Sequence, residues 1–189
     1  DFTDSQSGVE KCSWGIGSQA GETDVMDLTD NGAAVQATNS SLSLQNGGEF
    51  FVTVVCFNHA GLSVSATSTG IIVDVTRPSF DALPVITVAL HETYDGIMTV
   101  RWREFVDAET DIWYYKVAVG TSPNGAQYSK FIHVGRNTSF ELSARQMTDG
   151  ELYYATVQAT NRAGLESVAV SAPFISDRIV PRPGIVLDG

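Results

Sequence analysis

The feature that most constrains this chain is an internal repeat with an offset of 103 residues. The segment 58–62 (Asn-His-Ala-Gly-Leu) reappears at 161–165 as Asn-Arg-Ala-Gly-Leu, and the same offset relates Pro78 to Pro181. A repeated unit of this length is the size of one domain. The chain is therefore expected to contain two copies of one module, with no net insertion between the matched points.

The boundaries of the repeats do not coincide with the two ends of the sequence. We divide the sequence into an incomplete repeat at 1–78, a complete repeat at 79–181 and the start of a third repeat at 182–189. The first repeat lacks about a quarter of its length, so we expect the natural protein to continue on the N-terminal side. The alternative is that residues 185–187 complete a neighbouring chain by strand addition.

Alternation of apolar and polar residues predicts β-strands along both repeats. The alternating segments are separated by turn-forming Asn-Gly and Asp-Gly pairs, and no stretch has a convincing helical period. Short strands and glycine-rich turns in a unit of about 100 residues predict an all-β protein built of β-sandwiches. The alternating segments are 12–16, 50–56, 98–102, 115–119 and 153–159.

Two of these segments resemble the fibronectin type III family. Residues 98–102 (Met-Thr-Val-Arg-Trp) are similar to its second strand, and 147–164 is similar to its E–F turn, its corner tyrosine (Tyr153) and its F strand. In the first repeat Phe50 stands in place of that tyrosine. The resemblance implies tandem fibronectin type III-like sandwiches of a large extracellular multi-repeat protein. It also implies that the first repeat keeps strands C to G and lacks A and B.

The resemblance places the two cysteines, Cys12 and Cys56, on the adjacent C and F strands and facing inward. We therefore expect a disulfide closing a loop of 43 residues, worth about 3–4 kcal/mol in the chain-entropy model. Two buried free thiols are the alternative. The second repeat has Tyr115 and Ala159 at these positions, a large and small pair that would fill the same space.

Composition narrows the classes of protein to which this chain could belong. Apolar residues form 43% of the chain and charged residues 17%, which suits a packed core. The 22 acidic and 11 basic residues give a net charge of −11, which argues against nucleic acid as a partner. No apolar run is long enough to span a bilayer. Two glycosylation sequons, at Asn39 and Asn137, together with the expected disulfide, indicate an extracellular or cell-surface protein.

Nothing in the sequence indicates catalysis, a metal centre or a cofactor. The three histidines, His59, His91 and His133, lack the spacing of metal ligands, and no nucleophile motif is present. The carboxylates of Asp107, Glu109 and Asp111 suggest a calcium site, but a solvated loop fits better because the first repeat keeps only one of them, as Asp4. Asp74 and Asp177 near the repeat junctions are expected to be turn residues, with a junctional ion as the alternative.

These features predict a non-enzymatic structural or adhesive array, whose partners are other repeats or chains of the same assembly and other extracellular proteins. Short proline-containing junctions would make the array semi-stiff. Trp113 and Tyr114 are the candidate partner contacts, although Trp113 would also fit packed beneath a loop. The alternatives are the ligand-binding ectodomain of a receptor, recognising for example a carbohydrate, and spacer domains of a larger secreted enzyme.

Overall fold

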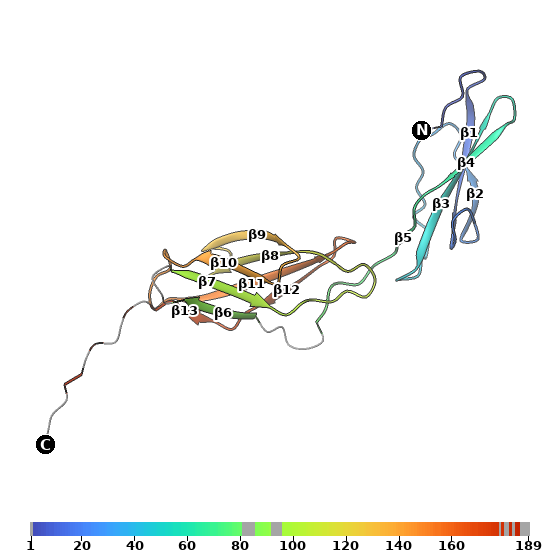
Figure 1. Cartoon of the computed structure of the whole chain (residues 1–189). Helices are drawn as coiled ribbons and strands as arrows, with labels where there is room; N and C mark the ends of the chain where they lie inside the picture. The colour runs from blue at the N-terminus through green and yellow to red at the C-terminus, as the bar shows by residue number, and fades with distance from the viewer. Residues whose placement is uncertain are drawn as a thin grey trace. The chain divides into compact units, whose positions relative to one another are not determined.

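The computed structural model describes residues 2–80, 86–91 and 96–177, together with 179, 182, 184 and 185, and of His91 only the backbone. These residues form two compact units. The first comprises Asp1–Thr76 with Ala108–Thr110, and the second comprises Arg77–Asp107 with Asp111–Gly189 (Figure 1). Most of the third repeat expected at 182–189 lies outside the described residues. The junction prolines Pro181 and Pro183 also lie outside them.

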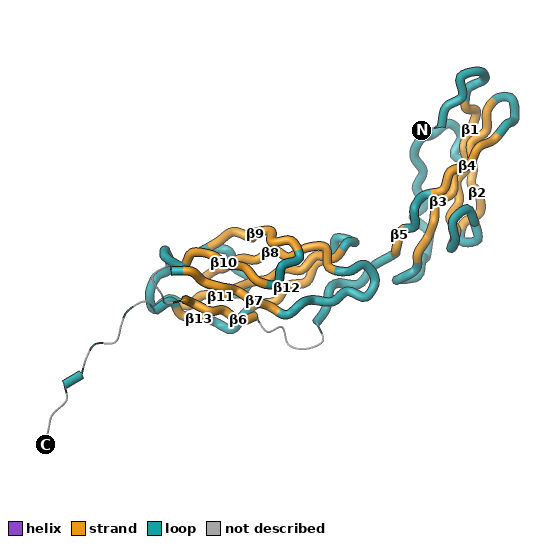
Figure 2. The backbone as a smooth tube through the Cα atoms, in the orientation of Figure 1, coloured by secondary structure: helices purple, strands orange, loops and turns teal. Residues whose placement is uncertain are grey.

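The first unit contains one antiparallel sheet (Figure 2). The strand order is β2-β1-β3-β4, and the short strand β5 also pairs with β3. Its strands are β1 (Val9–Gly17), β2 (Met26–Asp30), β3 (Glu49–Asn58), β4 (Ser63–Thr67) and β5 (Ile71–Ile72).

The second unit is a complete β-sandwich with strands in the orders β10-β7-β6 and β12-β11-β8-β9, plus β13 on β11. This arrangement is that of a fibronectin type III-like sandwich, so the expected fold class is confirmed here. Its strands are β6 (Ile86–His91), β7 (Ile97–Trp102), β8 (Ile112–Gly120), β9 (Ser129–Gly135), β10 (Ser139–Ser143), β11 (Leu152–Asn161), β12 (Glu166–Val170) and β13 (Phe174–Ile175).

Alternating residues of the two facing sheets build the core of the second unit. Val100 of β7 packs in one cluster with Val117 of β8 and Val157 of β11, and all three are fully buried. The Trp102 and Tyr115 rings meet edge to face, with centroids 5.6 Å apart. Burial raises the pKa of the Tyr115 hydroxyl, whose oxygen accepts a hydrogen bond from the Phe105 backbone N–H at 3.1 Å. The second unit is therefore closed around an ordered aromatic and aliphatic interior.

Residues related by the 103-residue offset also have equivalent partners in the strand pairings of the two units. Trp14 lies opposite Val54 in the pairing of β1 with β3, and Val117 lies opposite Val157 in the pairing of β8 with β11. The edge strands keep the same relation: Ile16 pairs with Met26 and, 103 residues later, Val119 pairs with Ser129. Equivalent positions of the two sequences thus occupy equivalent positions of the two sheets.

The corner tyrosine forms the bonds that its position in the E–F turn requires. The Tyr153 oxygen accepts a hydrogen bond from the Thr148 backbone N–H at 2.9 Å and donates to the Glu151 carboxylate at 2.9 Å. The ring is 3% exposed and stacks near Phe174. In the first unit Phe50 has no hydroxyl for this role, as the sequence indicated.

The resemblance implied strands C to G in the first repeat, and not all of them form. The segment 36–40, which the repeat offset relates to β10, has no regular structure. In the second unit the equivalent strand β10 pairs with β7, whereas the described strands of the first unit, β1 to β5, belong to one sheet.

We predict that Tyr153→Phe lowers the free energy of unfolding of the second unit by about 1 kcal/mol, because the hydrogen bonds of its hydroxyl to the Thr148 N–H and the Glu151 carboxylate are lost. Denaturant unfolding followed by the buried aromatic signals measures this. Tyr154→Phe, which alters the neighbouring half-buried ring, is the matched control and should change stability by less than about 0.5 kcal/mol. Equal effects of the two substitutions would contradict the role given to the corner.

Candidate interaction surfaces

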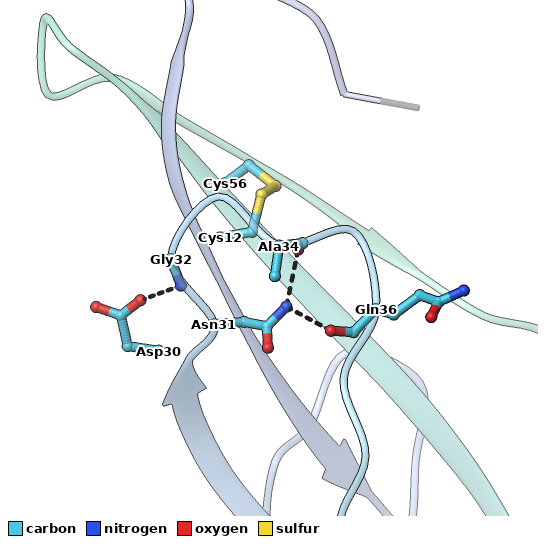
Figure 3. Close-up of a disulfide and its surroundings, with 7 residues drawn as sticks. All are labelled: Cys12, Asp30, Asn31, Gly32, Ala34, Gln36 and Cys56. Carbon is cyan, nitrogen blue, oxygen red and sulfur yellow. Dashed lines mark hydrogen bonds between the residues drawn. A yellow bond between two sulfur atoms is a disulfide. The ribbon is translucent and has the colours of Figure 1, made fainter.

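The disulfide between Cys12 and Cys56 expected from the sequence is present and joins β1 to β3 (Figure 3). The two residues lie directly opposite each other, with Cα atoms 4.0 Å apart. The Cys12 backbone N–H donates to the Gly32 carbonyl at 2.8 Å, and its carbonyl accepts from the Asn31 N–H at 2.9 Å. Because these bonds turn the backbone groups of Cys12 away from β3, the pair occupies a non-hydrogen-bonded site, where side chains of neighbouring strands approach most closely.

The turn that follows β2 lies beside this disulfide (Figure 3). The Asn31 amide donates to the carbonyls of Ala34 and Gln36, at 2.8 and 3.1 Å, and the Asp30 carboxylate accepts from the Gly32 N–H at 2.7 Å. These bonds hold the start of the irregular segment 33–37 against the inner face of the sheet.

The inner face of the first sheet remains incompletely covered. Trp14, Val52 and Val54 are half-buried, whereas their equivalents in the second unit are fully buried. A groove of about 810 Å³ follows this face and is lined by Trp14, both valines and residues 33–37. Less apolar burial leaves a larger share of the stability of this unit to the disulfide.

We predict that reduction of the disulfide, or Cys12→Ala with Cys56→Ala, destabilises the first unit by about 3–4 kcal/mol because its unfolded state gains loop entropy. Amide hydrogen exchange in β1 and β3 should accelerate accordingly. The second unit contains no cysteine and serves as the internal control, so exchange in β8 and β11 should not change. Unchanged protection in β1 and β3 would contradict the prediction.

An aspartate–asparagine pair closes one end of each sheet. The Asn58 amide donates to Asp4 at 3.2 Å, and the Asn161 amide donates to Asp107 at 3.0 Å, again at an offset of 103. Each asparagine oxygen also accepts a backbone N–H from the turn that follows, for example that of Leu165 at 2.7 Å. The pair therefore ties the loop before one central strand to the turn after the other.

In the first unit, Asp4 is the charged member of this aspartate–asparagine pair. Its carboxylate accepts backbone N–H bonds from Ser7 at 2.6 Å and Gly8 at 3.0 Å. The Ser7 N–H bond, with the Asn58 amide second, lowers the pKa of Asp4 to about 2, although slight desolvation opposes this. The charged form thus organises the loop 4–8.

The pKa of Asp4 is lower in the folded than in the unfolded chain, whose value is 3.8. Its contribution to stability is therefore complete above about pH 4 and is lost as the pH falls towards about 2. We predict that Asp4→Ala accelerates amide exchange of residues 6–8 at pH 5, and that the difference from the wild type disappears near pH 2. A difference independent of pH would contradict the role of the charge.

The acidic segment 107–111 is divided between the two units. Glu109 belongs to the first unit, where it accepts hydrogen bonds from the Asn46 amide and the Thr76 hydroxyl, both at 2.7 Å. Asp111 belongs to the second and adopts a left-handed backbone, with φ 62°. Glu109 thus has protein hydrogen-bond donors as partners in this structure.

Asp74 and Asp177 occupy equivalent turns near the ends of the two repeats. The Asp74 carboxylate accepts the Thr76 backbone N–H, and the Asp177 carboxylate accepts the Ile179 backbone N–H, both at 3.0 Å. Both contacts are those of an Asx turn, in which an aspartate bonds the backbone two residues on.

An aromatic cluster lies on the outer surface of β8 and β9, and it contains both candidate contact residues. Trp113 is 55% exposed, and its ring centroid is 5.3 Å from that of Tyr114. The Tyr114 ring also meets the His133 ring at 4.6 Å, and the Lys116 ammonium lies 5.3 Å from its centroid. Trp113 is therefore on the surface and not beneath a loop. Exposed tryptophan beside tyrosine is typical of binding hot spots.

The first unit lacks this cluster. Lys11 and Asp30 stand at the positions of Tyr114 and His133, and they form an ion pair with 3.9 Å between nitrogen and oxygen. The sequence analysis singled out Tyr114 but not His133, which is 19 residues further on. The pairing of β8 with β9, in which His133 lies opposite Lys116, brings the histidine to the Tyr114 ring.

Both sequon asparagines are exposed. Asn39 lies in the irregular segment before β3, where its side chain accepts the Ser41 backbone N–H at 2.9 Å. Asn137 lies in the turn between β9 and β10, where its own N–H donates to the Val134 carbonyl at 3.3 Å. Both amides are within reach of solvent, and their glycosylation stays a prediction.

Comparison with known proteins gives no family by sequence. No family model matches the chain, and no curated protein matches it. Among solved structures, the chain is similar to the FN1–FN3 domains of chicken CNTN1, with 15% identity and a TM-score of 0.42 over 85% of this chain. The matched part is 56% of that fragment. Within the described residues, no helix has the length and hydropathy needed to cross a membrane.

Proposed function

We propose that this chain is a non-catalytic segment of an extracellular structural or adhesive array and makes protein–protein contacts through the outer face of its second sandwich. The aromatic cluster of Trp113, Tyr114 and His133 carries the proposal. It is exposed, it contains the residue types that dominate binding energy, and it lies on a sandwich with a closed core.

Two further observations support the extracellular part of the proposal. A disulfide such as Cys12–Cys56 persists in oxidising compartments, and the exposed sequons Asn39 and Asn137 suit a glycosylated surface. A β-sandwich repeated along the chain is also an architecture in which function is placed on exposed loops and edges, because the interior is filled by side chains.

Receptor-type ligand recognition is the second candidate function. It requires an aromatic and polar patch in one repeat that the other repeat lacks, and the cluster beside Lys116 fits that description. The same patch serves both candidates, and the chemistry of the partner distinguishes them. A protein partner would meet Trp113 as a buried anchor, whereas a carbohydrate would stack on its ring.

We predict that beads coated with the chain bind to matrix deposited by cultured cells and that Trp113→Ala weakens this binding about tenfold or more, since truncation of an anchoring tryptophan costs about 2 kcal/mol. Protease treatment of the matrix should abolish binding if the partner is a protein, and glycosidase treatment should leave it intact.

Leu152→Ala is the matched control, because Leu152 is also an exposed apolar residue of the second sandwich, at 47%. This variant should bind as the wild type does. Binding that is insensitive to Trp113→Ala, or that is lost equally in both variants, would contradict the proposal that the aromatic cluster makes the contact.

A further inference from the structure

Equivalent hairpins of the two units carry opposite charge. Between Ile112 and Phe140, which include β8 and β9, there is no acidic residue, and the basic residues are Lys116, Lys130 and Arg136. The matching stretch 9–37, which includes β1 and β2, has one lysine and five acidic residues: Glu10, Glu22, Asp24, Asp27 and Asp30. In a chain of net charge −11, a hairpin without a single carboxylate is an unusual concentration of positive charge.

The difference in charge between the two hairpins is clearest along their outermost strands, β2 and β9. β2 and β9 are edge strands of their sheets, so among the residues that the structure describes one side of each backbone has no neighbouring strand of its own unit. Residues 27–30 of β2 are Asp-Leu-Thr-Asp, and the equivalent residues 130–133 of β9 are Lys-Phe-Ile-His; all eight side chains are exposed. Each strand therefore presents two uncharged residues, Leu28 and Thr29 in β2 and Phe131 and Ile132 in β9, between charged or ionisable ones, and the charges of the two strands are complementary.

We infer that β9 of one chain docks against β2 of a second copy of this chain and extends one sheet into the next. The inference rests on the proposed array function and names the partner that such an array would use. Backbone hydrogen bonds between the edges supply affinity, and the flanking charges select the partner strand. Like-charged contacts, β2 with β2 or β9 with β9, are disfavoured by the same residues.

The contact joins two different surfaces, so it is heterologous. A heterologous contact propagates from chain to chain, because each copy still offers one free strand of each kind. Leu28, Phe131 and Ile132 are 48%, 41% and 39% exposed, and they would be covered in the contact. The strands are short, so a single contact is weak, and repetition along an array would multiply its effect.

The test uses the full chain and two variants that each remove one surface. Lys130→Glu with Arg136→Glu alters only the basic hairpin, and Glu22→Lys with Asp27→Lys alters only the acidic one. Sedimentation velocity at about 0.1–1 mM, where weak contacts are populated, should show association of the wild type. Either variant alone should associate about tenfold or more weakly. Mixing the two variants should restore association, because the unchanged acidic β2 of the first meets the unchanged basic β9 of the second, and the two charge-reversed strands are again complementary to each other.

The matched control is Arg101→Glu with Arg162→Glu, which gives the same net charge as the first variant at exposed positions outside the hairpin. It should associate like the wild type. A monomeric wild type, an equal loss in this control, or a mixture that does not recover would overturn the inference. Matrix binding sensitive to Trp113 together with a monomeric chain would overturn only this inference and leave the proposed function standing.

Discussion

The antiparallel pairing of the two central strands is the constraint on which both units depend. In each sheet, the C-type strand (β1 or β8) lies against the F-type strand (β3 or β11) in an identical register. This register decides which side chains face inward, because a shift by one residue would turn every side chain of a strand to the other face. It also fixes the edge strand beside the C-type strand, and with it every surface discussed above.

The two repeats fill the same central site by different means. In the second unit Tyr115 packs opposite Ala159 beneath a complete second sheet, and burial of a large ring stabilises the site. In the first unit the inner face has only an irregular segment over it, and a covalent bond between Cys12 and Cys56 occupies the position. The cross-link constrains the unfolded chain instead of adding buried area.

Local patterns predicted much of this structure, and non-local pairing limited the rest. Period-two alternation and the repeat offset predicted the central strands, because these depend on nearby sequence. The resemblance to the fibronectin type III family supplied the facing cysteines and the corner Tyr153. The resemblance implied a strand in the region where the segment 36–40 is irregular, and local sequence alone does not decide whether a strand forms. The aromatic cluster was found only in part, because His133 reaches Tyr114 through the pairing of β8 with β9.

Edge strands give a repeat protein both a hazard and a means of assembly. An unpaired edge invites pairing with any other strand, and charges on the edge oppose it. If both repeats carried the same charge there, every edge would repel every other. Here Asp27 and Lys130 occupy equivalent positions with opposite sign, so repulsion between like edges coexists with attraction between unlike ones. Divergence of two copies of one module can thus convert protection against aggregation into a directional contact, without any change in the fold.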